Sequence, residues 1–411
     1  METAKTHLME GVKKMIRAMY AGIGGMKSFQ TKLDVVGNNI ANVNTSGFKK
    51  GRVTFQDLVS QQMSGAATPT DNRGGINPMQ VGLGTSMGSI DTIHTQGSLQ
   101  TTGRDLDIGI TGDGFFIVND GGQSYYSRAG NFYLDENGDL VNANGLRVQG
   151  YSVVDGELDT NTLGPLQIAS GQLIPPQATD EAQFKGNLNS ETQVGETVNV
   201  PYPVIDSLGN MHYLELTFQK QAGNEWTVQA GGQALGNVNF GNDGSFVAAD
   251  DMTVNFNPGN NANPLNIELD FSRMSQYARN STADIHYVSG NVDGTLESYS
   301  ISQAGEIMGV FSNGEVRLLG QIALATFNNP GGLSKSGNNL YMVSNNSGNP
   351  QVGLAGDGGR GMLTGASLEM SNVDLSEEFT EMIVAQRGFQ ANTRMITTSD
   401  EILQELVNLK R

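Results

Sequence analysis

The amino-terminal region carries apolar residues at alternating intervals of three and four. The pattern begins at Ile16 and continues through Met19, Ile23, Met26, Phe29, Leu33, Val36, Ile40 and Val43. This spacing places every member on one stripe of a helix. Asn44-Thr45-Ser46-Gly47 follows, with a glycine where the carboxyl-terminal cap of a helix favours one. The pattern therefore predicts one long amphipathic helix.

A second amphipathic helix is predicted at the carboxyl-terminal end. Asp374 and Ser376 are N-cap candidates, and acidic residues follow them in what would be the first turn. The apolar stripe then runs through Phe379, Met382, Ile383, Phe389, Ile396, Leu403, Leu406 and Leu409. Polar residues interrupt this stripe at Gln386, Thr393 and Asp400, and polar positions within a helix seam can fix its register.

The residues between the two helices have the pattern of β structure. Helical periodicity is nearly absent from Gly82 to Met370, and short alternating segments are separated by turn residues. The chain has 54 glycines, which suits many tight turns. Two-residue hairpin turns are predicted at Asn137-Gly138, Asn144-Gly145, Asp243-Gly244 and Asn313-Gly314, and a loop is predicted around Ser64 to Pro78.

The predicted fold is mainly β with α-helical termini, in which the N- and C-terminal helices form a coiled coil and β domains are nested between them. We expect residues 15–80 and 365–411 to form a helical assembly domain, 81–155 and 290–364 an inner β domain, and 156–289 an outer β domain. Residues 1–14 are predicted to be a non-native extension, because Met9-Glu10-Gly11 can be encoded by a ribosome-binding sequence just upstream of Met15.

Charge and composition exclude several classes of protein. A net charge of −18 and a pI near 4.5 argue against nucleic acid as a partner, because phosphate contacts need clustered Lys and Arg. The sequence has no cysteine, which removes disulfides and thiolate chemistry. No stretch has the pattern of a cleaved signal peptide or a membrane-spanning helix, so no membrane partner is expected and any export would leave the amino terminus uncut.

Candidate chemistry is sparse. Asp135 to Asp139 superficially suggests a calcium loop, but its glycine stands at the fourth position instead of the sixth. The four histidines lack metal-ligand spacing, and the Gly-rich segment 353–361 lacks the Lys-Ser/Thr ending of a phosphate loop. Asp105 and Asp107 have no accompanying nucleophile. We therefore predict no catalytic residue, no cofactor and no metal.

The two terminal helices need partners. A lone amphipathic helix is marginal in water, and two paired helices would still expose apolar surface. Small residues that permit close packing occur at Ala18, Ala21, Gly22, Gly24, Gly25, Ala41 and Ala391. Other copies of the chain would cover this surface, and a repeated rotation that does not close would build a helical filament. A coiled coil within a monomer is the alternative.

The predicted assembly interface has apolar and amide members. Its residues are Met19, Ile23, Met26, Leu33, Val36, Ile40, Asn38, Asn42, Phe379, Ile383, Phe389, Ile396, Leu403 and Leu406. The cluster of Asn38, Asn39, Asn42 and Asn44 could register adjacent subunits, and Asn38 and Asn42 lie four apart on one helix face. Simple helix termination with locally satisfied amides explains the same asparagines equally well.

Several stretches of the chain match known sequence signatures. They are residues 33–49, LDVVGNNIANVNTSGFK, with PMQVGLG at 78–84, GDGFF at 112–116 and YSRAGNF at 126–132, and near the other end LEMSNVDL at 368–375 and QRGFQAN at 386–392. In these stretches the chain resembles the flagellar rod and hook proteins, the last two being similar to the carboxyl-terminal signature of the family. Asp206 to Asn210 and Trp226 resemble the outer domain of hook subunits, which favours a hook subunit over a rod subunit.

This resemblance implies a function. Copies would polymerise into a curved tube, the hook, which acts as an extracellular universal joint and passes motor torque from rod to filament. It also implies type III export through the flagellar export apparatus without signal cleavage. The expected partners are copies of the chain and the distal rod, hook cap and hook–filament junction proteins. The alternatives are a distal rod subunit or, from another class, a secreted β-rich enzyme or adhesin.

Overall fold

The computed structural model describes residues 2–69, 73–154, 156–169 and 171–408, with the side chains of 2–14, 406 and 407 excepted. The chain forms two compact units. Unit 1 comprises residues 1–168, 300–307 and 318–411, and unit 2 comprises 169–299 and 308–317. Three strands have residues in both units: β23 (Gly294–Ile301), β24 (Glu306–Phe311) and β25 (Val316–Thr326).

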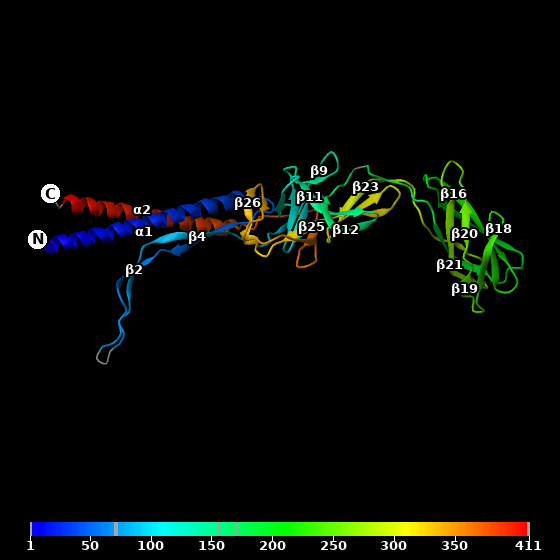
Figure 1. Cartoon of the computed structure of the whole chain (residues 1–411), viewed down its shortest axis with the longest axis horizontal. Coiled ribbons are helices and arrows are strands. Elements are labelled where there is room, and N and C mark those ends of the chain that lie inside the picture. The colour runs from blue at the N-terminus through cyan, green and yellow to red at the C-terminus, as the bar shows by residue number, and fades with distance from the viewer. Residues whose placement is uncertain (1, 70–72, 155, 170, 409–411) are drawn as a thin grey trace. The chain divides into compact units, whose positions relative to one another are not determined.

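Two long helices from opposite ends of the chain pack against each other in unit 1. They are α1 (Glu2–Ala41) and α2 (Leu375–Asn408), and they lie side by side (Figure 1). Of the two N-cap candidates, Asp374 caps α2, because its Oδ1 accepts hydrogen bonds from the backbone N–H of Ser376 at 2.8 Å and of Glu377 at 3.4 Å. Helical termini on a mainly β chain confirm the predicted fold class.

The rest of unit 1 is β structure with one 3₁₀ turn, η1 (Pro330–Gly332). Its strands are β1 (Gly51–Asp57), β2 (Ser60–Ser64), β3 (Met79–Gly82), β4 (Thr85–Thr92), β5 (Leu99–Thr101), β6 (Ile108–Thr111), β7 (Phe115–Asn119), β8 (Ser124–Ser127), β9 (Tyr133–Leu134), β10 (Leu140–Val141), β11 (Arg147–Val154), β12 (Glu157–Pro165), β26 (Ser334–Gly337), β27 (Leu340–Met342), β28 (Gln351–Leu354), β29 (Met362–Gly365) and β30 (Ser367–Glu369).

The main sheet of unit 1 brings early and late strands together. Its order is β25-β11-β7-β8-β27-β26, with β12 beside β11 and β28 beside β25. Strand β7 is buried on both faces, since Phe115 to Val118 are all buried. One face packs Phe115 and Ile117 against Phe327 and Tyr341. Both ends of the sequence are therefore needed to complete this core.

The predicted Asn-Gly and Asp-Gly turns lie between paired segments, but the prediction that their loops have two residues is wrong. At the first of them, Gly138 N–H donates to the Asp135 carbonyl and Asp135 N–H donates to the Asp139 carbonyl. The loop thus has three residues, with Gly138 at φ 82°, and Asn137 does not take the positive φ that a type I′ turn requires. Asp135 Oδ1 also accepts the Asn137 and Asp139 amides, which favours the longer loop.

Unit 2 contains two sheets. Its strands are β13 (Leu173–Ile174), β14 (Glu181–Asn189), β15 (Thr197–Ile205), β16 (Met211–Lys220), β17 (Glu225–Ala230), β18 (Gln233–Phe240), β19 (Phe246–Ala249), β20 (Thr253–Phe256), β21 (Leu265–Tyr277) and β22 (Asp284–Val288). One sheet has the order β15-β16-β17-β18-β19, and the other has the order β20-β21-β14-β22. Buried side chains from both sheets form one hydrophobic cluster, so the unit is a β-sandwich.

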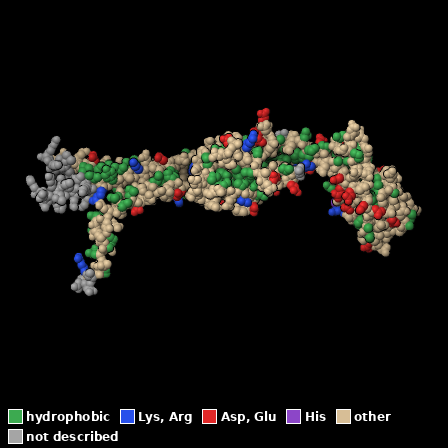
Figure 2. Space-filling view, viewed as in Figure 1, with side chains coloured by type: hydrophobic (Ala, Val, Ile, Leu, Met, Phe, Trp, Pro, Cys, Tyr) green, Lys and Arg blue, Asp and Glu red, His purple; other side chains and the backbone are tan. Residues whose placement is uncertain are grey.

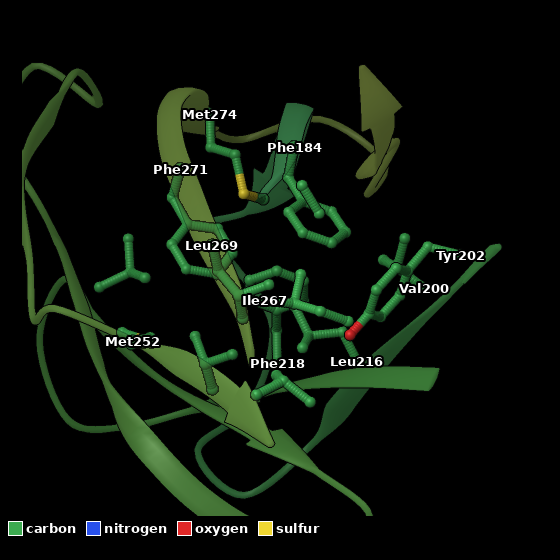
Figure 3. Close-up of a cluster of buried hydrophobic side chains, with 14 of the residues drawn as sticks. Phe184, Val200, Tyr202, Leu216, Phe218, Met252, Ile267, Leu269, Phe271 and Met274 are labelled. Carbon is green, nitrogen blue, oxygen red and sulfur yellow. The ribbon is translucent and has the colours of Figure 1, made fainter. Parts of the chain in front are cut away.

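Aromatic rings occupy the centre of this sandwich. Phe184 of β14 stacks on Phe271 of β21 with ring centroids 5.5 Å apart and meets the Tyr202 ring edge-on at 5.4 Å (Figure 3). Trp226 is fully buried, and its Nε1–H donates to Gln276 Oε1 at 3.1 Å. Burial of Phe184, Tyr202 and Trp226 at one place gives unit 2 its own core.

Candidate assembly interface

The surface of α2 that faces α1 follows a regular heptad. Its buried and half-buried positions alternate four and three apart: Glu378, Met382, Ala385, Phe389, Asn392, Ile396, Ser399 and Leu403. We call this row the α2 seam. Large side chains alternate with small or polar ones along it. Such a row leaves room for the knobs of a closely packed partner helix.

Glycines let the two helices approach closely. A Cβ added at Gly25 would lie 3.0 Å from both amide atoms of Asn392, and one added at Gly22 would lie 3.3 Å from Ile396. On the opposite helix, a Cβ at Gly388 would meet the Phe29 ring at 2.5 Å. Phe29 and Ile396 thus fit into positions where the facing helix has no side chain. Close contact of this kind raises van der Waals packing along the pair.

Polar contacts set the register at the β-sheet end of the helix pair. Asn39 is 2% exposed, and its Nδ2 donates to Glu378 Oε2 at 3.1 Å and to the Gly51 carbonyl at 2.9 Å. Lys32 forms an ion pair with Glu381, which lies about one turn beyond Glu378 on α2. Buried polar pairs in a helix seam specify one register, because any shift leaves them unpaired.

The predicted interface residues differ in how far the structure buries them. Phe389, Ile396 and Leu403 lie in the α2 seam, and Val36 is 5% exposed on the facing surface of α1. Met19, Ile23, Met26, Leu33 and Ile40 are half-buried, while Phe379 and Ile383 are 49% and 58% exposed. Leu406 lies outside the described side chains. Within the described part of one chain, about half of each of the Phe379 and Ile383 side chains stays uncovered.

Among the described contacts, neither Asn38 nor Asn42 forms a hydrogen bond to α2, and the bonds of Asn42 are local. Asn42 Nδ2 donates to the Asn38 carbonyl at 2.9 Å, and Asn42 Oδ1 accepts from Thr45 Oγ1 at 3.1 Å. Both bonds help to end α1. Asn38 is exposed. The amide that joins α1 to α2 belongs to the neighbouring Asn39, whose spacing of seven from Lys32 and fourteen from Gly25 could have placed it in the seam.

Exposed apolar side chains flank the seam of α2. Leu375, Phe379 and Ile383 repeat every fourth residue on one side, and Val384, Met395 and Ile402 follow eleven and seven apart on the other. Each is at least 40% exposed. Figure 2 shows hydrophobic side chains at the surface of the helical part of unit 1. A helix that is apolar on more than its paired face is typical of one that meets further partners.

A hairpin beside the helices is also apolar at its surface. Strands β2 and β3 pair antiparallel, with Ser60 opposite Gly82, and project from the helix pair (Figure 1). The sequence pattern had predicted only a loop for much of this segment. Its exposed apolar residues are Leu58, Val59, Met63, Ile76, Met79 and Val81. An isolated two-stranded ribbon is marginal alone, so this one also needs a covering surface.

His94 is a half-buried titratable group in unit 1. Its ring lies 5.7 Å from that of Phe115 and 5.6 Å from that of Tyr341, and its Nδ1 has no hydrogen-bond partner among the described residues. Burial, together with the nearby charges of Lys49 and Arg128, lowers the pKa of His94 from 6.5 to about 4. His94 is therefore neutral in the folded chain at pH 5.

We expect acid to destabilise unit 1 through His94. The unfolded chain binds a proton near pH 6.5 and the folded chain only near pH 4, so stability falls as pH drops through this window. The loss amounts to at most about 3 kcal/mol. Guanidinium titrations followed by circular dichroism at pH 7 and pH 4.5 measure it. The His94→Phe variant keeps a ring and should lose less stability; an identical loss would contradict the assignment.

No group of three or more His, Asp or Glu among the described side chains is arranged to hold a metal ion. Within the same part of the chain, no helix has both the length and the apolarity needed to cross a membrane. The notable feature of the surface is instead apolar area on paired helices and on the β2–β3 hairpin.

Two terminal helices that pair with each other, carry inserted β domains and keep apolar faces uncovered define a class of structural proteins that assemble. Family comparisons agree with this class. Four models match: "Flagella basal body rod protein" at residues 19–49, "Flagellar hook protein FlgE/F/G D1 domain" at 109–200, "Flagellar basal body protein FlaE D2 domain" at 199–290 and "Flagellar basal body rod FlgEFG protein C-terminal" at 365–409.

Relatives align over nearly the whole chain. The flagellar hook protein FlgE of Borreliella burgdorferi is 42% identical over 96% of this chain and 100% of its own length. The flagellar basal-body rod protein FlgG of Bacillus subtilis is 37% identical over 97% and 100%. The Helicobacter pylori hook protein FlgE2 structure shares the fold, with a TM-score of 0.53 at 16% identity over 66% of this chain and 100% of its own. The chain belongs to the flagellar hook and rod protein family.

Proposed function

We propose that copies of this chain polymerise into the tube of a bacterial flagellar hook. The observation that carries the proposal is the apolar surface left on the paired helices, of which Phe379 and Ile383 are the clearest examples. Helix packing within the chain uses the α2 seam and adjoining positions such as Gly388 and Thr393, and leaves these exposed side chains outside it. Neighbouring copies related by a repeated rotation would cover the remainder and generate a helical filament.

The β structure of the chain suits a tube that bends while it rotates. A joint that bends under torque needs subunits that stay rigid inside while their contacts with neighbours exchange. The aromatic core of unit 2 supplies the rigidity. Polar, hydrated surfaces exchange contacts at low cost, which would let neighbouring subunits slide. The assembled tube would then pass rotation from the rod to the filament while bending.

Partners and location follow from this role. The tube would join the distal rod at one end and the hook–filament junction at the other, and a cap protein would assist growth. The subunit would leave the cell through the flagellar export apparatus with its amino terminus uncut, and the hook would lie outside the cell. We propose no enzymatic activity, cofactor, nucleic acid or membrane partner, and residues 1–14 remain a predicted non-native extension.

A distal rod subunit is the second candidate. It is favoured by the 37% identity over 97% of the chain to a relative named as a basal-body rod protein. The hook is favoured by the higher identity, 42% over 96% of the chain, to a relative named as a flagellar hook protein. Deletion of the gene in its native cell separates the two roles: electron microscopy should reveal complete rods without hooks, whereas missing distal rods would favour the rod role.

Polymerisation itself tests the interface. We expect Phe379→Asp and Ile383→Asp to raise the critical concentration for tubes by at least about ten-fold, since burying an apolar side chain contributes about 1.5–3 kcal/mol. Sedimentation and electron microscopy measure this, with added cap protein if the parent needs it. Thr398→Asp, exposed on the same helix but off the row of Phe379 and Ile383, is the matched control for charge. Normal assembly of both apolar-to-Asp variants would contradict the proposed interface.

A further inference from the structure

One buried carboxylate joins four segments of unit 1. Glu369 is 1% exposed, and its Oε1 accepts hydrogen bonds from Lys49 Nζ at 2.7 Å and from the Gly97 backbone N–H at 2.9 Å. Its Oε2 accepts from Arg128 Nη1 at 3.2 Å. We call Lys49, Arg128 and Glu369 the charge cluster. The carboxylate thus has partners in more than one direction, which limits how the segments can move.

The two cations extend the same network. Lys49 Nζ also donates to the Thr95 carbonyl at 2.8 Å, and Arg128 Nη2 donates to the Gly112 carbonyl at 2.8 Å. Lys49 is 0% exposed and Arg128 is 2% exposed. All three charged groups are therefore withdrawn from water. A buried ion cluster of this kind adds little net stability over apolar side chains of similar size, so its directional bonds need another explanation.

The cluster lies where the chain leaves α1 and enters α2. Lys49 follows the end of α1, Glu369 ends the last strand before α2, and Arg128 follows β8 of the main sheet. Backbone bonds reinforce the same place, since Gly47 N–H donates to the Glu369 carbonyl at 2.8 Å. Gly47 has φ 70°, and a Cβ there would lie 2.5 Å from the Ala129 nitrogen. The root of both helices is thus held against the main sheet.

Three separate sequence motifs each supply one member. Lys49 ends the stretch from Leu33, Arg128 stands in the YSRAGNF stretch, and Glu369 stands in the LEMSNVDL stretch. In sequence they are 79 and 241 residues apart, yet they meet at one carboxylate. Sequence reasoning assigned their charges no role. The three motifs therefore act together in forming the charge cluster.

We propose that Glu369 is a positioning residue that holds the roots of both terminal helices to the main sheet of unit 1, so that the helix pair and the sheet move as one body. Load applied to the sheet then reaches the helices through directional bonds instead of through flexible connections. Only this mechanical meaning rests on the proposed hook function. The positional claim concerns a single subunit and stands or falls without assembly.

Hydrogen exchange on dilute subunits tests the proposal. The triple variant Lys49→Met, Arg128→Met and Glu369→Leu fills similar volume without charges, so the melting temperature should stay close to that of the parent. We expect the amides of residues 47–50 and 95–98 to exchange at least about ten-fold faster, since bonds to charged groups are lost there. Mass spectrometry of peptic peptides resolves both segments. Parent-like exchange in these segments would overturn the proposal.

Two further variants sharpen the result. The exposed pair Lys50–Glu377, with Nζ and Oε2 2.7 Å apart, stands one residue away from the cluster, and Lys50→Met with Glu377→Gln should leave exchange at 95–98 unchanged. If the triple variant fails to fold, Glu369→Gln replaces it. Exchange that rises first in the two root segments supports the positioning role, and exchange that rises evenly across unit 1 overturns it.

Discussion

Gly25→Leu should abolish tube formation while leaving the β structure of units 1 and 2 folded. The smallest side chain at this position already places a Cβ 3.0 Å from the Asn392 amide, and leucine adds three more carbons in the same direction. The two helices would have to separate along the seam, which costs about 1–3 kcal/mol within each subunit. Every copy in a polymer suffers the same loss. Sedimentation at rising concentration, with circular dichroism to confirm β structure, measures the outcome.

Alanine variants provide matched controls for this expectation. Gly37→Ala lies on the same helix, but its Cβ meets no atom within 4 Å, so assembly should be unchanged or slightly improved by the better helix propensity of alanine. Gly25→Ala gains the same propensity but contacts Asn392, and its critical concentration should lie above that of Gly37→Ala. Tubes formed by Gly25→Leu at parental concentration would refute close helix pairing at this glycine.

Phe184→Ala should destabilise unit 2 by about 3–5 kcal/mol, because it removes a fully buried ring and leaves a cavity. The Phe184 ring contacts those of Phe271 and Tyr202, and these would lose partners on one side. Trp226 is the single tryptophan of the chain and lies in unit 2, so its fluorescence in urea reports this unit directly.

Tyr213→Ala is the control for the core substitution. Tyr213 lies on β16 and is 74% exposed, so its removal should change stability by no more than about 0.5 kcal/mol. A Phe184→Ala variant that unfolds at the urea concentration of the parent would show that the sandwich core does not depend on this ring. An equal loss in both variants would point to an effect on strand pairing instead of on the core.

The period of the apolar residues was enough to predict both helices and the β region between them. Periodicity reports which face of an element is buried, and it did so for Val36, Phe389, Ile396 and Leu403. It could not separate the seam from its flanks, because Phe379 and Ile383 follow the same spacing. Turn positions were predictable from Asn-Gly and Asp-Gly pairs, but loop length was not, since side chains such as Asp135 choose between turn types.

The residues that sequence reasoning missed are mostly small or charged. Gly388 and Ser399 carry no hydrophobic signal, although Gly388 allows the close approach of Phe29 and Ser399 is buried. Glu378 looks like a surface residue until its partner Asn39 on the other helix is known. Lys49, Arg128 and Glu369 come from three distant segments, and no local pattern links them. Such contacts depend on topology, which single-sequence patterns do not contain.

The pairing of the first and last helices has a consequence for synthesis. Met26 and Thr393 touch although 367 residues separate them, so α1 lacks its partner helix until nearly the whole polypeptide exists. A product truncated by early termination or proteolysis would therefore present an unmatched α1 and be unable to add to a growing polymer. Only a full-length polypeptide can form the helix pair, so the fold itself limits assembly to complete subunits.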